Sequence, residues 1–162
     1  MKEIKETCYK GTRILIGNEK RNIINKMVKI LENQKFTEIS IPVIQYQKYF
    51  EGKVGEENNN LMFNFKDRRN RELCLSPEYT AIIQQLSKTI FKYQKDVKLF
   101  YVQECFRGEK PQAGRYRQFT QLGVELLNPS GNFRTLDYII HQALMCVETI
   151  TKEYKLNENA TR

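Results

Sequence analysis

Two stretches near the middle of the chain have the apolar and polar pattern of neighbouring strands. Residues 99–106 are apolar and β-prone, and residues 118–127 alternate with a period of two. One face of the second stretch carries Phe119, Gln121, Gly123 and Glu125, whereas the other face is mostly apolar. This pattern predicts the floor of a binding site, and a solvated hairpin with an exposed polar face is the alternative.

Apolar residues recur at helical spacing in three other stretches. We expect helices over residues 18–33, 76–95 and 133–154. Asn18 and Ser76 stand where N-caps are expected, and Pro77 takes a first helical position. Strands are expected at 36–42, 61–66 and 72–75, with a short helix around 45–50 and a turn at 67–70.

The composition is that of a globular protein with a basic surface. The 162 residues fit one domain with a real core, and the net charge of +8 favours polyanionic partners such as nucleotides or RNA. The four cysteines lack metal-binding spacing, so we expect reduced core thiols, and the single histidine, His141, predicts no metal site. No apolar run is long enough for a signal peptide or a membrane span, so we expect a cytoplasmic protein without membrane association.

A basic loop joins the two central stretches. It contains Arg107, Lys110, Arg115 and Arg117, spaced by Gly108, Pro111 and Gly114. Arginine forks match phosphate oxygens, and glycine lets a backbone come close to a ligand. The loop therefore predicts binding of a polyphosphate.

Residues 106–125, FRGEKPQAGRYRQFTQLGVE, closely resemble motif 2 of class II aminoacyl-tRNA synthetases in its histidyl-tRNA synthetase form. That form has an FRxE start, a PQxGRYRQF loop and a QxGxE second strand. Three shorter stretches resemble segments of the same family. KGTRILIG at 10–17 resembles its KGTRD signature, and FTEISIP at 36–42 resembles the end of motif 1. SPEYT at 76–80 resembles its LRPEGT segment. Ile14, Ser76 and Tyr79 depart from these patterns.

The resemblance implies an α+β fold, with an antiparallel sheet flanked by helices in the class II synthetase manner. Residues 1–162 would form a single domain, the N-terminal half of a catalytic core, with motif 1 at about 18–42 and motif 2 at about 99–127. It also implies a homodimer. We expect dimerisation or a rearrangement to cover the sheet edge that such a half domain leaves unpaired.

Roles at an ATP site follow from the motif 2 resemblance. Arg107 would act in catalysis, on the α-phosphate and the substrate carboxylate. Glu109 would contact adenine or order the loop, Arg115 would reach the outer phosphates, and Phe119 would stack on adenine. ATP would be a substrate accompanied by Mg²⁺.

The resemblance places an amino acid, expected to be histidine, beside the nucleotide. Its ammonium would be held by Glu78 with help from Thr80, and Gln121 and Glu125 would line the histidine pocket. The alternative for Glu78 is a favourable charge at the first turn of a helix. Lys110 and Arg117 would contact the tRNA acceptor end or form plain surface.

No stretch resembles the histidine-specific segment, motif 3 or the anticodon-binding domain of the family. We therefore expect ATP and amino-acid binding, and at most formation of an aminoacyl-adenylate, without full aminoacylation by this chain alone. Losing one electrostatic donor costs such a site ~100–1000-fold in rate. The alternatives are a non-catalytic module that binds nucleotide, tRNA or a protein partner, and a piece of a longer synthetase.

Overall fold

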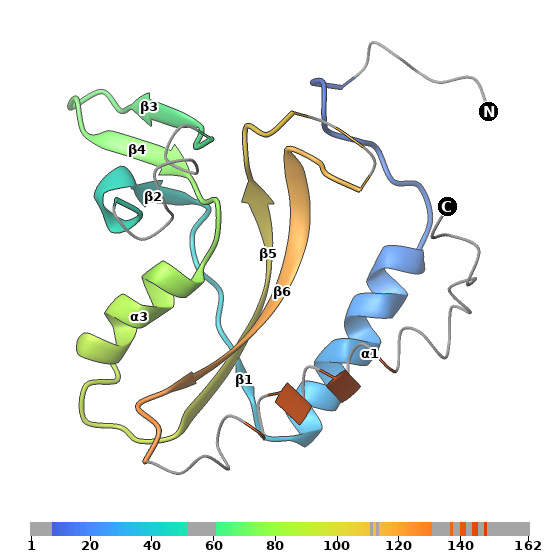
Figure 1. Ribbon diagram of the computed structural model, residues 1–162, viewed down its shortest axis with the longest axis vertical. Coiled ribbons are helices and arrows are strands. Elements are labelled where there is room, and N and C mark those ends of the chain that lie inside the picture. Colours follow the sequence, from blue (N-terminus) through green and yellow to red (C-terminus); the bar gives the residue numbers. More distant parts are fainter. Residues whose placement is uncertain are drawn as a thin grey trace.

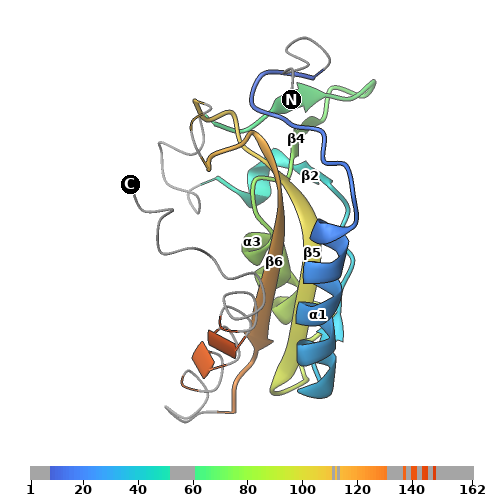
Figure 2. The same ribbon diagram turned by 90° about the vertical axis from the view of Figure 1, so that its right-hand side faces the viewer.

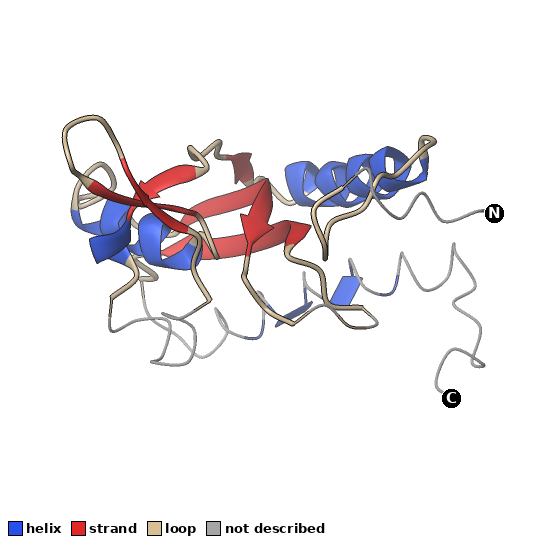
Figure 3. Cartoon of the chain, turned by 90° about the horizontal axis from the view of Figure 1, so that it is seen from above, coloured by secondary structure: helices blue, strands red, loops and turns tan. Residues whose placement is uncertain are grey.

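The computed structural model describes residues 8–51, 61–110, 112, 114–130 and six helical positions at 137, 140, 141, 144, 145 and 148. The strands form two three-stranded sheets, with the orders β1-β5-β6 and β2-β4-β3 (Figure 1). This is the α+β architecture that the sequence predicts. In the view of Figure 3, most strands lie between helical segments at either end of the molecule.

A long antiparallel hairpin is the centre of the fold. Its strands are β5 (Val97–Phe106) and β6 (Gln118–Leu127), paired from Val97↔Leu127 to Phe106↔Gln118. Both predicted strands are confirmed. The register is well specified, because the alternating pattern of β6 fixes which of its faces is buried. Within the described residues, β6 is paired along one edge only.

The strand expected over residues 36–42 is shorter in the structure. β1 (Thr37–Glu38) runs parallel to β5, and the Ile39 amide continues the pairing by donating to the Phe100 carbonyl at 2.8 Å. The chain then crosses to the second sheet (Figure 1). Pro42 lacks the N–H that a continuing ladder needs.

The second sheet consists of β2 (Ile44–Tyr46), β3 (Asn64–Lys66) and β4 (Glu72–Leu75). The helix expected around 45–50 is wrong in its first half, because Ile44–Tyr46 pair with β4 and only the 3-10 turn η1 (Gln47–Tyr49) follows. The predicted turn at 67–70 is confirmed. Its Asp67 carboxylate accepts hydrogen bonds from the Arg69 and Arg71 amides.

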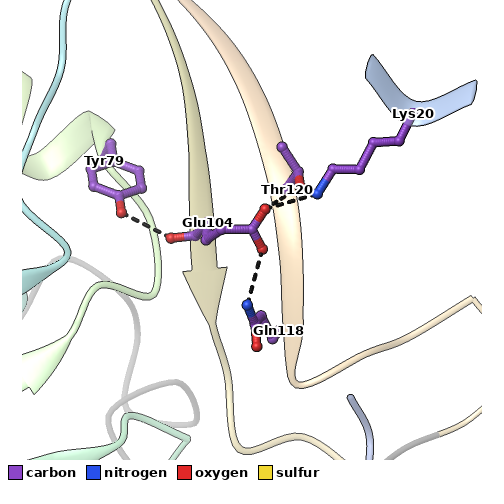
Figure 4. A network of polar contacts seen from close by, with 5 residues as sticks. All are labelled: Lys20, Tyr79, Glu104, Gln118 and Thr120. Atoms are coloured by element: carbon purple, nitrogen blue, oxygen red, sulfur yellow. Dashed lines mark hydrogen bonds and ion pairs between the residues drawn. The ribbon is translucent and has the colours of Figure 1, made fainter. Parts of the chain in front are cut away.

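Helix α1 (Glu19–Asn33) covers one face of the hairpin, where Leu31, Phe36 and Phe100 form a buried cluster (Figure 2). Asn18 stands at the N-cap, but its side chain makes no capping hydrogen bond. Instead, Lys20 forms an ion pair of 2.9 Å with Glu104 of β5. Figure 4 shows that the Glu104 carboxylate also accepts hydrogen bonds from Thr120 and Gln118, which ties α1 to both strands.

Helix α3 (Thr80–Lys88) packs on the opposite face, where Ala81, Ile82 and Ile83 join Leu99 and Tyr101 in the larger core cluster. The helix expected over residues 76–95 is wrong at both ends. The backbone of Ser76 is bonded to neighbouring segments instead, with its amide on the Val43 carbonyl and its carbonyl on the Phe106 amide. Ser76 is therefore not an N-cap, and its hydroxyl donates to the Glu78 carbonyl.

Other expectations have mixed outcomes. Cys74 and Cys105 are buried free thiols as predicted, whereas Cys8 is exposed and is not a core residue. Cys146 lies outside the described residues. The helix expected at 133–154 lies mostly outside them, although the six positions described there are helical. No helix in the described ranges has the length and apolar character that a bilayer span requires.

Candidate functional site

The face of β6 that carries the predicted site residues is turned toward α3. Phe119, Gln121, Gly123 and Glu125 lie opposite Cys105, Gln103, Tyr101 and Leu99 of β5. Phe119 and Glu125 are six positions apart, which spans roughly 20 Å of strand. The face therefore has two ends, one near the basic loop and one near the start of α3.

Glu125 and Thr80 meet at the α3 end of this face. The Thr80 hydroxyl donates to Glu125 Oε1 at 2.7 Å, although the residues are 45 positions apart. Burial raises the pKa of the Glu125 carboxyl above its ordinary value, against the opposing hydrogen bond from Thr80. Since the Thr80 proton is committed to Glu125, this end offers acceptors and negative charge, which suit an ammonium or another donor-rich group.

Glu78 lies just before α3, and both of its carboxylate oxygens face the Ala81 amide, at 3.0 and 3.2 Å. This contact satisfies an unpaired N–H at the start of α3, although Glu78 precedes the helix and does not lie in its first turn, where the alternative placed it. The charge of Glu78 also contributes to the raised pKa of Glu125, so the two carboxylates belong to one electrostatic environment. The structure thus gives Glu78 a capping contact and leaves its ligand role a prediction.

Gln121 lies between the two ends and is oriented by a residue that sequence reasoning missed. The Cys105 thiol donates to Gln121 Oε1 at 3.0 Å. Burial raises the pKa of Cys105 to about 12, so the thiol keeps its proton at neutral pH. The Gln121 carbonyl is therefore engaged, and its NH₂ group is the part that can donate to a ligand.

Tyr101 is a second residue that sequence reasoning missed, because its partners come from other segments. Its ring lies across Gly123 so closely that a Cβ there would be 2.1 Å from Tyr101 Cζ. Only 1% of Tyr101 is exposed, and burial raises its pKa to about 12. Tyr79, which departs from the family's LRPEGT pattern, is fully buried, with its ring centroid 5.4 Å from that of Tyr101 and its hydroxyl donating to the Glu104 carbonyl (Figure 4).

Arg107 and Phe119 lie together at the loop end. The Arg107 Nε donates to the Pro77 carbonyl at 3.0 Å, and its guanidinium carbon lies 5.2 Å from the Phe119 ring centroid. The stacked guanidinium is thus aimed by the segment that precedes α3. Its terminal nitrogens make no hydrogen bond within the described residues, so they are available to an anion.

The remaining predicted nucleotide residues, Glu109 and Arg115, lie on the loop itself. Arg115 Nη1 is 3.6 Å from Glu109 Oε2, and 65% of the Arg115 side chain is exposed. An ion pair this exposed is weak, so Arg115 can leave it for a phosphate. Arg117 differs, because its guanidinium donates to the Glu109 and Lys10 carbonyls and to the Tyr9 hydroxyl.

Two features lie apart from this face. An apolar cavity of about 530 Å³ is lined by residues that include Ile41, Ile82 and Leu86, and none of the predicted site residues lines it. His141 is exposed, and the described part of the chain contains no group of three or more His, Cys, Asp or Glu residues that could hold a metal ion.

A family model described as histidyl-tRNA synthetase matches residues 17–155. The chain belongs to the histidyl-tRNA synthetase family. The histidine–tRNA ligase of Methanococcus vannielii is 36% identical over 152 residues, which are 91% of this chain and 36% of the relative. That of Pyrococcus abyssi is 37% identical over 122 residues, 73% of this chain and 28% of the relative.

Solved structures agree with the family at the level of the fold. An ATP phosphoribosyltransferase regulatory subunit/histidyl-tRNA synthetase from Bacillus halodurans gives a TM-score of 0.74 at 23% identity, covering 91% of this chain and 39% of that one. The apo histidyl-tRNA synthetase of S. aureus gives 0.70 at 22% identity, covering 88% and 39%. The chain thus spans little more than a third of the relatives it matches most fully.

Proposed function

We propose that this chain binds ATP and histidine on the α3-facing side of β6 and forms part of the amino-acid activation site of a histidyl-tRNA synthetase. The observation that carries the proposal is the arrangement along one strand face. Acceptors of Glu125 and Thr80 lie at one end, and the Arg107–Phe119 pair lies at the other. The Gln121 amide lies between them, where an amino-acid carboxylate and an α-phosphate would meet.

The reaction that suits this arrangement is adenylate formation. A carboxylate oxygen of the amino acid attacks the α-phosphorus of ATP. The bond between this phosphorus and the oxygen that bridges to the β-phosphate breaks, and pyrophosphate leaves with that oxygen and the bonding electron pair. Negative charge develops on the α-phosphate oxygens, and the Arg107 guanidinium would meet it there. Mg²⁺ would enter with ATP, bound mainly by its phosphates.

Transfer to tRNA, a homodimer and a cytoplasmic location are the further parts of this proposal. They rest on the family relationship. The relatives are named histidine–tRNA ligases, and this chain covers 36% of the length of the Methanococcus vannielii ligase and 28% of that of Pyrococcus abyssi. We therefore assign amino-acid activation to the site and propose that full aminoacylation needs the rest of a synthetase.

Calorimetric titration tests the proposal directly. Wild type, Arg107→Ala and the control Arg68→Ala are titrated with ATP and Mg²⁺, and then with histidine. Arg68 is exposed on the β3–β4 turn, so its variant has the same loss of charge far from the site. We expect ATP binding by wild type and the control, a loss of at least about tenfold in Arg107→Ala, and tighter histidine binding in the presence of ATP. Absence of ATP and histidine binding in the wild type would overturn the proposal, whereas binding leads to a pyrophosphate-exchange assay.

A further inference from the structure

Arg117 has more polar contacts than the other arginines of the motif 2 loop, which we define as residues 107–117. Its Nε donates to the Glu109 carbonyl at 2.9 Å, and its Nη1 donates to the Tyr9 hydroxyl at 2.9 Å and the Lys10 carbonyl at 3.2 Å. Its guanidinium carbon also lies 5.1 Å from the Tyr9 ring centroid. This side chain therefore joins the two halves of the loop to the N-terminal segment.

The backbone makes the same connection. The Arg117 amide donates to the Gly11 carbonyl at 2.7 Å, and the Arg107 amide donates to the Arg117 carbonyl at 2.9 Å. Next to it, the Arg13 guanidinium lies 4.2 Å from the Tyr116 ring centroid and donates to the Tyr116 hydroxyl. The N-terminal segment, residues 9–13, is thus held against the second half of the loop by main-chain and side-chain contacts.

A second contact fixes the position of the N-terminal segment relative to the small sheet. The Tyr9 ring packs edge-on against Phe63, with ring centroids 6.3 Å apart. The other half of the loop is held nearby, because the Gly108 amide donates to the Leu61 carbonyl at 2.6 Å. The first half of the loop therefore contacts the stretch just before β3 directly, and the second half is linked to it through Tyr9.

Arg115 and Arg117 consequently have different tasks, although they are two positions apart. The Arg115 side chain is largely exposed, and its partner among the described residues is the Glu109 carboxylate, so it can turn to a ligand. The Arg117 guanidinium is occupied by protein acceptors, and a ligand could recruit it only by breaking those bonds. This argues against the alternatives of a tRNA contact or plain surface for Arg117.

We propose that Arg117 is a positioning residue that, together with Tyr9 and Gly11, holds the motif 2 loop in the form that presents Arg115 and Glu109 to the outer phosphates of ATP. The ATP part rests on the proposed function, whereas the ordering of the loop does not. Without the anchor, ATP has to order the loop on binding and loses affinity, while adenosine, which lacks phosphates, is unaffected.

Limited proteolysis tests the anchor without any ligand. Tyr9→Ala leaves every tryptic site in place, so cleavage of the Arg115–Tyr116 bond, followed by mass spectrometry, reports the opening of the loop. We expect this bond to be cut about tenfold faster in Tyr9→Ala and Arg117→Ala than in wild type, with Arg68→Ala as the matched control. Cleavage at the wild-type rate in both variants would overturn the inference.

Ligand titration then separates positioning from direct phosphate contact. We expect ATP affinity to fall about tenfold in Tyr9→Ala, Arg117→Ala and Arg117→Lys. Arg117→Lys belongs to this group because lysine keeps the charge but cannot contact the Glu109 and Lys10 carbonyls and the Tyr9 hydroxyl together. Adenosine affinity should change less than about twofold in all three variants. Restored ATP affinity in Arg117→Lys, or equal losses for ATP and adenosine, would overturn the inference. If wild type binds no ATP, the proposed function fails, and the proteolysis result alone decides the anchor.

Discussion

Gly123 is a position at which one added methyl group should be damaging. Its φ is not in the positive range, so the backbone itself accepts alanine. A Cβ there would lie 2.1 Å from Cζ, 2.3 Å from the hydroxyl and 2.4 Å from Cε1 of Tyr101. Tyr101 is 1% exposed and packs against fully buried Tyr79, so its ring cannot swing into solvent without opening the core.

The size of the effect follows from these distances. Forcing extra methyl groups into a packed core typically costs about 1–3 kcal/mol. An alanine at an unstrained position gains back about 0.4–1 kcal/mol, because the unfolded chain loses freedom. We therefore expect Gly123→Ala to lower the free energy of unfolding by about 1–2 kcal/mol.

Urea denaturation monitored by circular dichroism measures this value, and a double-mutant cycle with Tyr101→Ala identifies the cause. In the Tyr101→Ala background the clash is gone, so Gly123→Ala should be neutral or stabilising by up to about 1 kcal/mol. The reasoning is wrong if Gly123→Ala costs less than about 0.5 kcal/mol in the wild-type background, or if it costs the same in both backgrounds.

Three further predictions concern ionisable groups. The pKa of Glu104 lies below its ordinary value, because hydrogen bonds from Thr120 and Lys20 outweigh the opposing effect of burial. Its contribution to stability should therefore be lost as pH falls below the ordinary carboxyl range. Urea denaturation of Glu104→Gln should show a smaller loss of stability in acid than that of the wild type. The pKa of Glu125 is raised, so its contribution to stability is present in acid and is lost as pH rises through its folded pKa. Glu125→Gln should therefore increase stability at pH 7, lose that gain in acid and weaken histidine binding. A loss of stability at pH 7 would contradict this. Among the described cysteines, native-state alkylation should modify exposed Cys8 first and Cys105 much more slowly, because Cys105 is buried and burial raises its pKa to about 12. Comparable rates by mass spectrometry would show that the Cys105 thiol is accessible.

The sequence by itself determined the elements that depend on local pattern. The β5–β6 hairpin has the predicted strands, because alternation over ten residues leaves one register that buries the apolar face. The Asp67 turn and the face shared by Phe119, Gln121 and Glu125 follow from equally local rules. The motif 2 pattern also identified the family, which the comparisons confirm.

Only the tertiary structure decided features whose causes lie far apart along the chain. The sequence pattern begins a helix at Ser76, but the Val43 carbonyl and Phe106 amide bind its backbone, so α3 starts at Thr80. The same holds for the thiol that orients Gln121 and the ring that covers Gly123. Arg117 looks like its neighbour Arg115 in sequence, and only the docked N-terminal segment distinguishes an anchored guanidinium from an available one. Such assignments depend on which residues, distant in sequence, the fold brings into contact with a side chain, and local periodicity contains no information about that contact.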